Sequence, residues 1–248
     1  MTGIFQDIAA AFQFLTRLPL ARLTYRPDAL SRSAKFFPLV GLALGAAAAG
    51  IYLLLSPHLP ATVVALLIVL FSTLATGGLH EDGLADVADA FGGGWNKPQI
   101  LQIMKDSRIG SYGALAIVIS VAARVLLLAN LPSGSFVQYA VSAEVLCRWT
   151  VLPLGAVLPG AREEASQGAR IARQISAVSL AAGTLLAFGI VGYLLHTAMW
   201  IPVVTASALA LLTGLYYKRH IGGITGDCFG ATIQLTLAAV YLCGVWHR

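Results

Sequence analysis

The acidic residues of this chain are few and clustered. Four of the eleven lie within nine positions, in the segment His80-Glu81-Asp82-Gly83-Leu84-Ala85-Asp86-Val87-Ala88-Asp89. On a helix, Asp82, Asp86 and Asp89 share one face, where their like charges repel one another. Mg²⁺ removes such repulsion, taking one or two carboxylates and keeping waters and phosphate oxygens as its other ligands. The segment therefore predicts a Mg²⁺ site, with His80 beside it as a ligand or proton acceptor. A solvated acidic helix end is the alternative.

A second polar segment combines two cations, a carboxylate and a hydroxyl. It reads Met104-Lys105-Asp106-Ser107-Arg108-Ile109-Gly110. Lysine and arginine neutralise phosphate oxygens and stabilise charge that develops during phosphoryl transfer. The segment predicts a diphosphate site, although a basic run beside a membrane is also a signal of topology.

A third segment places one carboxylate among glycines, in Gly222-Gly223-Ile224-Thr225-Gly226-Asp227-Cys228-Phe229-Gly230. Glycines allow a tight loop and a close approach of backbone N–H groups to an anion at a helix N-terminus. We interpret Asp227, at the end of a membrane span, as a further functional carboxylate. A flexible loop that enters the membrane is the alternative.

Three more ionisable residues, Arg124, Glu144 and Arg148, fall inside apolar segments. Such residues usually pair with each other or face a polar interior. Glu144 and Arg148 are four residues apart with the acid first, which favours a salt bridge within one helix. The alternative is that Arg148 lines a substrate cavity.

Composition indicates the elements that must position these groups. Of the 248 residues, 58% are hydrophobic and only 11% are charged, against about 25% charged in a soluble domain. Lipid must therefore be the solvent for much of the chain, and we expect an all-α polytopic membrane protein with one domain, residues 1–248. About 20 apolar residues cross a bilayer. Seven segments qualify: Phe36–Leu55, Ala61–Leu79, Gly110–Leu131, Phe136–Leu158, Ile175–Leu195, Trp200–Tyr217 and Gly230–Trp246.

The basic residues predict how the spans are oriented. They gather before the first span and in every second connection after it, at 17–35, 97–108, 162–173 and 218–219. The positive-inside rule then puts the N-terminus and all three polar segments at the cytoplasmic face of the inner membrane. The net charge of +5 is explained in this way and does not indicate nucleic-acid binding. Ile4–Leu15 predicts an amphipathic helix on the membrane surface.

With these segments described, the chain closely resembles the cobalamin synthase family, the membrane-bound adenosylcobinamide-GDP ribazoletransferases. Two elements in this order and spacing are specific: His-x-Asp-Gly-Leu-Ala-Asp and Met-Lys-Asp-Ser-Arg-x-Gly. The resemblance covers nearly the whole length. It is carried by Phe14–Pro19, Phe37–Gly41, Thr76–His80, Asp82–Asp86, Asp89, Ile103–Gly110 and Thr225–Asp227.

The resemblance implies a reaction and a set of roles. A hydroxyl of alpha-ribazole, or of its 5′-phosphate, attacks the cobinamide-side phosphorus of adenosylcobinamide-GDP, GMP leaves, and a phosphodiester forms, with Mg²⁺ as the metal. We expect the metal ligands to be Asp82, Asp86, Asp89 and Asp227. We expect the catalytic residues to be His80, Asp82, Lys105, Asp106 and Arg108. We expect substrate contacts from Lys105, Ser107, Arg108, Arg148, Thr225 and Gly226.

Two positions depart from the family pattern. Glu81 stands where the family often has an apolar residue, and Gln234, which cannot be an ionised ligand, stands where it often has Glu. Two other classes of protein are alternatives. A CDP-alcohol phosphotransferase would follow Asp-Gly with Ala-Arg, whereas Asp86 follows Ala85 here. A transporter would have repeated halves and a midplane site, but no repeat is visible and the charges cluster at one face. The sequence is compatible with an oligomer.

Overall fold

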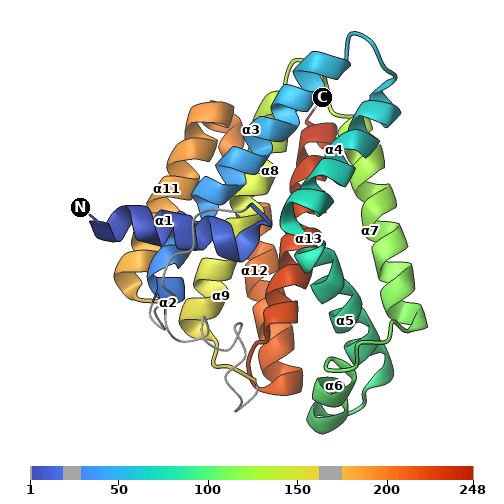
Figure 1. The fold of residues 1–248 in the computed structure, drawn as a ribbon, viewed down its shortest axis with the longest axis vertical. Helices are drawn as coiled ribbons and strands as arrows, with labels where there is room; N and C mark the ends of the chain where they lie inside the picture. Colours follow the sequence, from blue (N-terminus) through green and yellow to red (C-terminus); the bar gives the residue numbers. More distant parts are fainter. Residues whose placement is uncertain (1, 19–28, 162–174, 248) are drawn as a thin grey trace.

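Long apolar helices make up most of the structure, a computed structural model that describes residues 2–18, 29–161 and 175–247. Among the described residues there is no β-strand, so the all-α prediction is confirmed. The helices run side by side as a bundle, with α1 lying across it (Figure 1). In chain order they are α1 (Thr2–Leu15), α2 (Ala29–Ser33), η1 (Ala34–Phe36), α3 (Phe37–Leu55), α4 (Ala61–Thr76), α5 (Leu79–Gly93), α6 (Lys97–Ile103), α7 (Ser111–Ala129), α8 (Phe136–Trp149), α9 (Val151–Val157), α11 (Ala177–Leu195), η2 (His196–Met199), α12 (Trp200–Ile221) and α13 (Gly226–Trp246).

The described helices include enough apolar length to cross a membrane several times. Leucines along their outer faces are exposed, as expected where lipid replaces water. Five helical stretches qualify by length and composition, or six when α4 and α5 count together as one bent span. The five are Ser31–Leu55, Ser111–Ala129, Phe136–Val157, Ala177–Ile221 and Gly226–Trp246.

The expected number of seven spans depends on one long stretch. Ala177–Ile221 has 45 residues, which at about 1.5 Å per residue is roughly twice the thickness of a hydrocarbon core. It is interrupted at His196, whose φ is +48°, and seven spans result only when α11 and α12 are counted separately. The last span also begins earlier than the predicted Gly230, because the Thr225 hydroxyl caps α13 by accepting the N–H of Cys228.

A sharp bend between α4 and α5 positions the acidic segment. The two helix axes differ by 89°, and the turn between them uses Gly77 and Gly78, with φ of +68° and +71°. Glycine adopts this left-handed conformation without the steric cost that other residues incur. A Cβ on Gly77 would lie 2.2 Å from Nε of Arg17, so the chain after α1 packs directly on the bend. The span predicted over Ala61–Leu79 therefore ends at Thr76, where the bend begins.

The amphipathic helix predicted over Ile4–Leu15 is present as α1. Its C-terminal half packs on the bundle, where Leu15 is buried, whereas Phe5 at the other end is exposed. Its buried Asp7 forms ion pairs with Arg32 and Lys35, at 3.2 and 3.5 Å. These pairs fasten α1 to the start of the first span.

Glycines bring two pairs of helices into close contact. A Cβ on Gly41 of α3 would lie 2.2 Å from the backbone oxygen of Glu144 in α8. A Cβ on Gly83 of α5 would lie 2.8 Å from the backbone oxygen of Asp227 in α13. The second contact is the one that assembles the candidate site.

Candidate active site

The α5 helix presents its charged residues on two faces. Asp82 is exposed and Asp86, one turn later, is half-buried, whereas His80 and Glu81 are buried in the bundle. Carboxylates in the first turn are stabilised by the positive end of the helix dipole. Asp82 and Asp86 therefore form one acidic face of α5, a helix that runs away from the end of the bundle where the C-terminus lies (Figure 1).

The glycine contact between α5 and α13 brings Asp227 to this acidic face. Cα of Asp227 and Cα of Gly230 would lie 3.1 and 3.3 Å from a Cβ on Gly83. Conversely, a Cβ on Gly230 would lie 3.3 Å from Cα of His80. The predicted grouping of Asp227 with the acidic segment is thus matched by backbone-to-backbone packing of the two helices.

Thr225, at the start of α13, links that helix to the basic segment. Its hydroxyl lies 3.2 Å from the sulfur of Met104 and 3.2 Å from Oδ2 of Asp227. Because Met104 directly precedes Lys105, the contact holds the basic segment beside the N-terminus of α13. Thr225 itself is buried, whereas the next residue, Gly226, is exposed. Of the two predicted substrate contacts at the start of α13, only the one from Gly226 is therefore open to a ligand in this conformation.

Asp89 serves a structural purpose that the sequence did not indicate. Its Oδ2 accepts the N–H of Gly110 at 2.7 Å, and its Oδ1 accepts the N–H of Gly113 at 2.9 Å. Both groups belong to the N-terminus of α7, where the first N–H groups have no partner within the helix. Asp89 therefore caps α7 from a different helix and fixes the end of the basic segment. We assign it a positioning role instead of the expected metal-ligand role.

The basic segment between α6 and α7 is open to solvent. Lys105, Ser107 and Arg108 are exposed. The guanidinium of Arg108 donates to Asp106, with Nη2 2.6 Å from Oδ2. These hydrogen bonds lower the pKa of Asp106 to about 2 and raise that of Arg108. Asp106 thus orients Arg108, and such a weakly basic carboxylate is a poor proton acceptor at neutral pH.

A buried ion pair explains the unusual Glu81. Oε1 of Glu81 lies 3.0 Å from Nη2 of Arg124 in α7 and accepts the hydroxyl of Thr73 in α4 at 3.0 Å. Both charged side chains are almost fully buried. Glu81 therefore neutralises Arg124 inside the bundle and does not face the acidic site.

His80 is also buried, and its Nε2 has no hydrogen-bond partner among the described residues. In this conformation His80 does not reach the exposed face, so its expected catalytic role is not supported.

The predicted salt bridge within α8 is present. Nη1 of Arg148 donates to Oε2 of Glu144, and Oε1 of Glu144 accepts the hydroxyl of Ser72 at 3.3 Å. Arg148 is only 1% exposed. Neighbouring helices therefore cover Arg148 in this structure, and its expected contact with substrate stays a prediction. Gln234 is equally buried, and it accepts a hydrogen bond from Ser120 at 3.3 Å.

The described residues do not form a complete protein cage for a metal. Within residues 2–18, 29–161 and 175–247, no three histidine, cysteine or carboxylate side chains lie close enough to share one ion. This fits a Mg²⁺ site built from one or two carboxylates together with substrate oxygens. The predicted basic residues Arg162, Arg170 and Arg173 lie outside the described residues.

Sequence reasoning missed the partner of Arg124 and the capping role of Asp89. A signal existed for the first: Arg124 has no acidic residue within four positions, and Glu81 departs from the family pattern just before the acidic face. For Asp89 the only signal was the pair of glycines, Gly110 and Gly113, at the start of the next span. A Cβ at either position would lie within 2.4 Å of an Asp89 oxygen.

Comparison with known proteins gives one consistent result. Residues 7–245 match the family described as cobalamin-5-phosphate synthase. A relative from Polaromonas naphthalenivorans is 40% identical over 94% of each chain, and one from Leptospira interrogans is 37% identical over 94% of this chain and 92% of its own. A third, from Vibrio cholerae, is 33% identical over 94% of this chain. All three are named adenosylcobinamide-GDP ribazoletransferase. No solved structure matches the chain.

Proposed function

This chain belongs to the cobalamin-5-phosphate synthase family, and from that premise we propose that it joins adenosylcobinamide-GDP to alpha-ribazole or its 5′-phosphate. A ribazole hydroxyl attacks the cobinamide-side phosphorus, the bond from that phosphorus to GMP breaks, and a phosphodiester forms. The products are GMP and adenosylcobalamin or its phosphate. The relatives' names support the donor substrate and the transfer.

One observation carries the proposal to specific residues. The Gly83–Gly230 contact and the Thr225–Met104 contact bring the acidic face of α5, the start of α13 and the basic segment to one end of the bundle. Phosphoryl transfer depends mainly on positioning and on electrostatic stabilisation of phosphate charge. Carboxylates for a metal and cations for a diphosphate are the two components that it requires.

We assign the metal to the exposed face of α5. Asp82 and Asp86 would hold Mg²⁺ together with substrate oxygens, with Asp227 close by at the start of α13, while both oxygens of Asp89 remain bound to the start of α7. When bound, Mg²⁺ neutralises phosphate oxygens and makes the phosphorus more electrophilic.

The basic segment would grip the leaving side of the diphosphate. Lys105 and Arg108 are exposed cations, and Asp106 holds the Arg108 guanidinium in one orientation. Arginine in a fixed orientation binds phosphate oxygens through two parallel N–H groups. The negative charge that develops on the phosphate of the leaving GMP would therefore be stabilised by N–H groups of Arg108 that are already oriented.

Asp82 is the group that we assign to receive the proton of the attacking hydroxyl. His80 is buried away from the exposed face, and the pKa of Asp106 is held near 2 by Arg108. Asp82 is an exposed carboxylate on the acidic face. The charged nucleotide and the large corrinoid would reach it from the cytoplasm, where the positive-inside rule puts this end of the bundle.

The test uses the purified full chain in nanodiscs with adenosylcobinamide-GDP, alpha-ribazole and Mg²⁺. Chromatography should detect GMP and adenosylcobalamin in equal amounts, with neither formed in the presence of a chelator. At a Mg²⁺ concentration that just saturates wild type, Asp82→Asn and Asp86→Asn should strongly reduce the products while the protein stays folded. Gln99→Glu, on the exposed side of α6, is a control for an altered charge elsewhere at this end. Products that persist in both Asp variants would exclude the acidic face from the reaction. No product from folded wild type with either ribazole substrate would overturn the assignment.

A further inference from the structure

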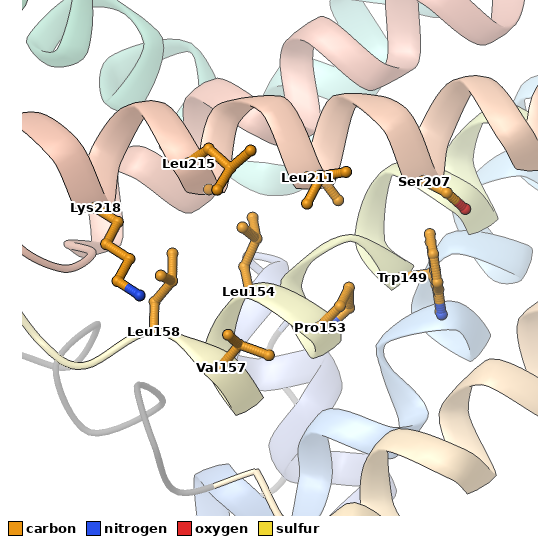
Figure 2. A pocket seen from close by; sticks show the side chains of 11 residues that line it. Trp149, Pro153, Leu154, Val157, Leu158, Ser207, Leu211, Leu215 and Lys218 are labelled. Atoms are coloured by element: carbon orange, nitrogen blue, oxygen red, sulfur yellow. The ribbon is translucent and has the colours of Figure 1, made fainter.

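An apolar groove runs between α9 and α12, away from the acidic face. Its cavity volume is about 310 Å³. Leu154 and Val157 form one wall, and Leu211 and Leu215 form the other (Figure 2). Gly214 of α12 also lines the groove. A Cβ on Gly214 would lie 2.9 Å from Cδ2 of Leu154, so glycine at this position lets Leu154 approach α12 closely.

The two ends of the groove differ chemically. At one end lies Trp149, whose indole N–H donates to the hydroxyl of Thr184 at 3.0 Å and whose ring contacts Phe188. At the other end lies Lys218, which among the described residues is the one charged side chain that lines the groove (Figure 2). Within the part of the chain that the structure describes, no ion pair engages the Lys218 ammonium. The groove therefore has an aromatic end at Trp149 and a cationic end at Lys218.

The length of the groove matches one leaflet of a bilayer. Ser207 and Lys218 mark its two ends on α12, and helix geometry separates them by about 16 Å. This is roughly half of the 30 Å hydrocarbon core. Val157, Leu211 and Leu215 are 57–71% exposed, which suits contact with lipid and not with water.

Lys218 also lies at the end of α12 that the positive-inside rule puts at the cytoplasmic surface, beside Arg219 and His220. A cation at this depth attracts the anionic lipids of that leaflet. We propose that the groove binds an anionic phospholipid of the cytoplasmic leaflet, with one acyl chain between α9 and α12 and its phosphate at the Lys218 ammonium. This site is independent of the proposed transfer reaction.

The groove offers matched pairs of variants. Lys218→Gln removes the cation at its mouth, and Arg219→Gln removes the adjacent cation, which does not line it. Leu211→Trp fills its middle, and Leu212→Trp adds the same bulk at a neighbouring residue that is equally exposed but lies outside it. Thermal unfolding in the same detergent checks that each variant is folded.

The measurement is native mass spectrometry of the full chain with added phosphatidylglycerol or phosphatidylcholine that carry the same acyl chains. Lys218→Gln should lower the preference for phosphatidylglycerol about fivefold, and Arg219→Gln should change it much less. Leu211→Trp should reduce binding of both lipids, unlike Leu212→Trp.

Three results would overturn the proposal. Equal effects of the two glutamine variants would show that Lys218 does not hold the phosphate. Equal binding by the two tryptophan variants would show that the groove does not hold the chain. If wild type stripped of lipid dimerises and Leu211→Trp prevents this, the occupant is a second copy of the chain.

Discussion

Replacing Asp89 with Asn separates positioning from metal binding at the acidic face. The Asn side chain keeps one acceptor oxygen, so one of the two N–H groups at the start of α7 loses its partner and meets an amide NH₂ instead. A hydrogen bond to a charged acceptor contributes about 1.5–3 kcal/mol. We therefore expect Asp89→Asn to lower the free energy of unfolding by about 2 kcal/mol, measured by denaturant titration in mixed micelles.

The same substitution, Asp89→Asn, should slow the reaction without weakening the binding of Mg²⁺. Asp89 fixes Gly110, two residues after Arg108, so its loss lets the basic segment shift. A displacement of about 1 Å at a reacting centre can reduce the rate about 100-fold. We expect kcat/KM to fall between about 10-fold and 100-fold, while the Mg²⁺ concentration for half-maximal rate stays within about twofold of wild type.

Two further variants make the comparison decisive. Gly113→Ala leaves the carboxylate intact but would place a Cβ 2.3 Å from Oδ2 of Asp89, so it should reproduce the slow rate with the wild-type Mg²⁺ requirement. Asp86→Asn should raise that requirement by about tenfold or more. The reasoning is refuted if Asp89→Asn raises the Mg²⁺ requirement as much as Asp86→Asn while the stability of the protein is unchanged.

Three other predictions concern groups around the site. Glu81→Leu or Arg124→Leu alone should destabilise the protein by about 3–5 kcal/mol, because each leaves a buried charge unpaired. In a double-mutant cycle measured by thermal unfolding, the double variant should recover much of this loss. Additive losses would argue against an ion pair between Glu81 and Arg124. The pKa of Asp106 is lowered from 3.8 to about 2, so its ion pair with Arg108 is complete above about pH 4 and is lost only as the pH falls towards 2. The pH–rate profile of Asp106→Asn between pH 5 and 9 should therefore keep the wild-type shape. Loss of the acidic limb of that profile would identify Asp106 as the general base. Gly83→Ala should push α5 away from α13 and lower kcat/KM by at least about 10-fold, whereas Gly93→Ala, at the far end of α5 and in ordinary contact there, should be near wild type.

The membrane class and the three polar segments could be predicted because each depends on local composition. Apolar runs of about 20 residues identify spans without knowledge of their neighbours. The bend at Gly77 could not be read in this way, because the apolar run continues through it to Leu79. What breaks the span is a pair of left-handed glycines, of which Gly77 packs against Arg17, a contact between segments 60 residues apart.

The roles of individual charges were harder to predict than their grouping. Spacing along α5 correctly puts Asp82, Asp86 and Asp89 on one side, but spacing does not show what each carboxylate contacts. Asp89 meets the N-terminus of another helix, and Glu81 meets an arginine in the middle of a span. Both partners come from α7, whose position relative to α5 is a property of tertiary packing.

The 89° bend and the two faces of α5 together explain how a carboxylate-rich helix can belong to a membrane protein. A charged side chain facing lipid is costly, and this cost is avoided by pairing or by access to water. Glu81 uses pairing, since Arg124 neutralises it inside the bundle. Asp82 would use water at the proposed cytoplasmic face, since the bend turns α5 away from the axis of α4 and this residue is exposed. Straightening the bend would carry the acidic face along the line of the preceding span, so the proposed active site depends on the left-handed glycines as well as on its carboxylates.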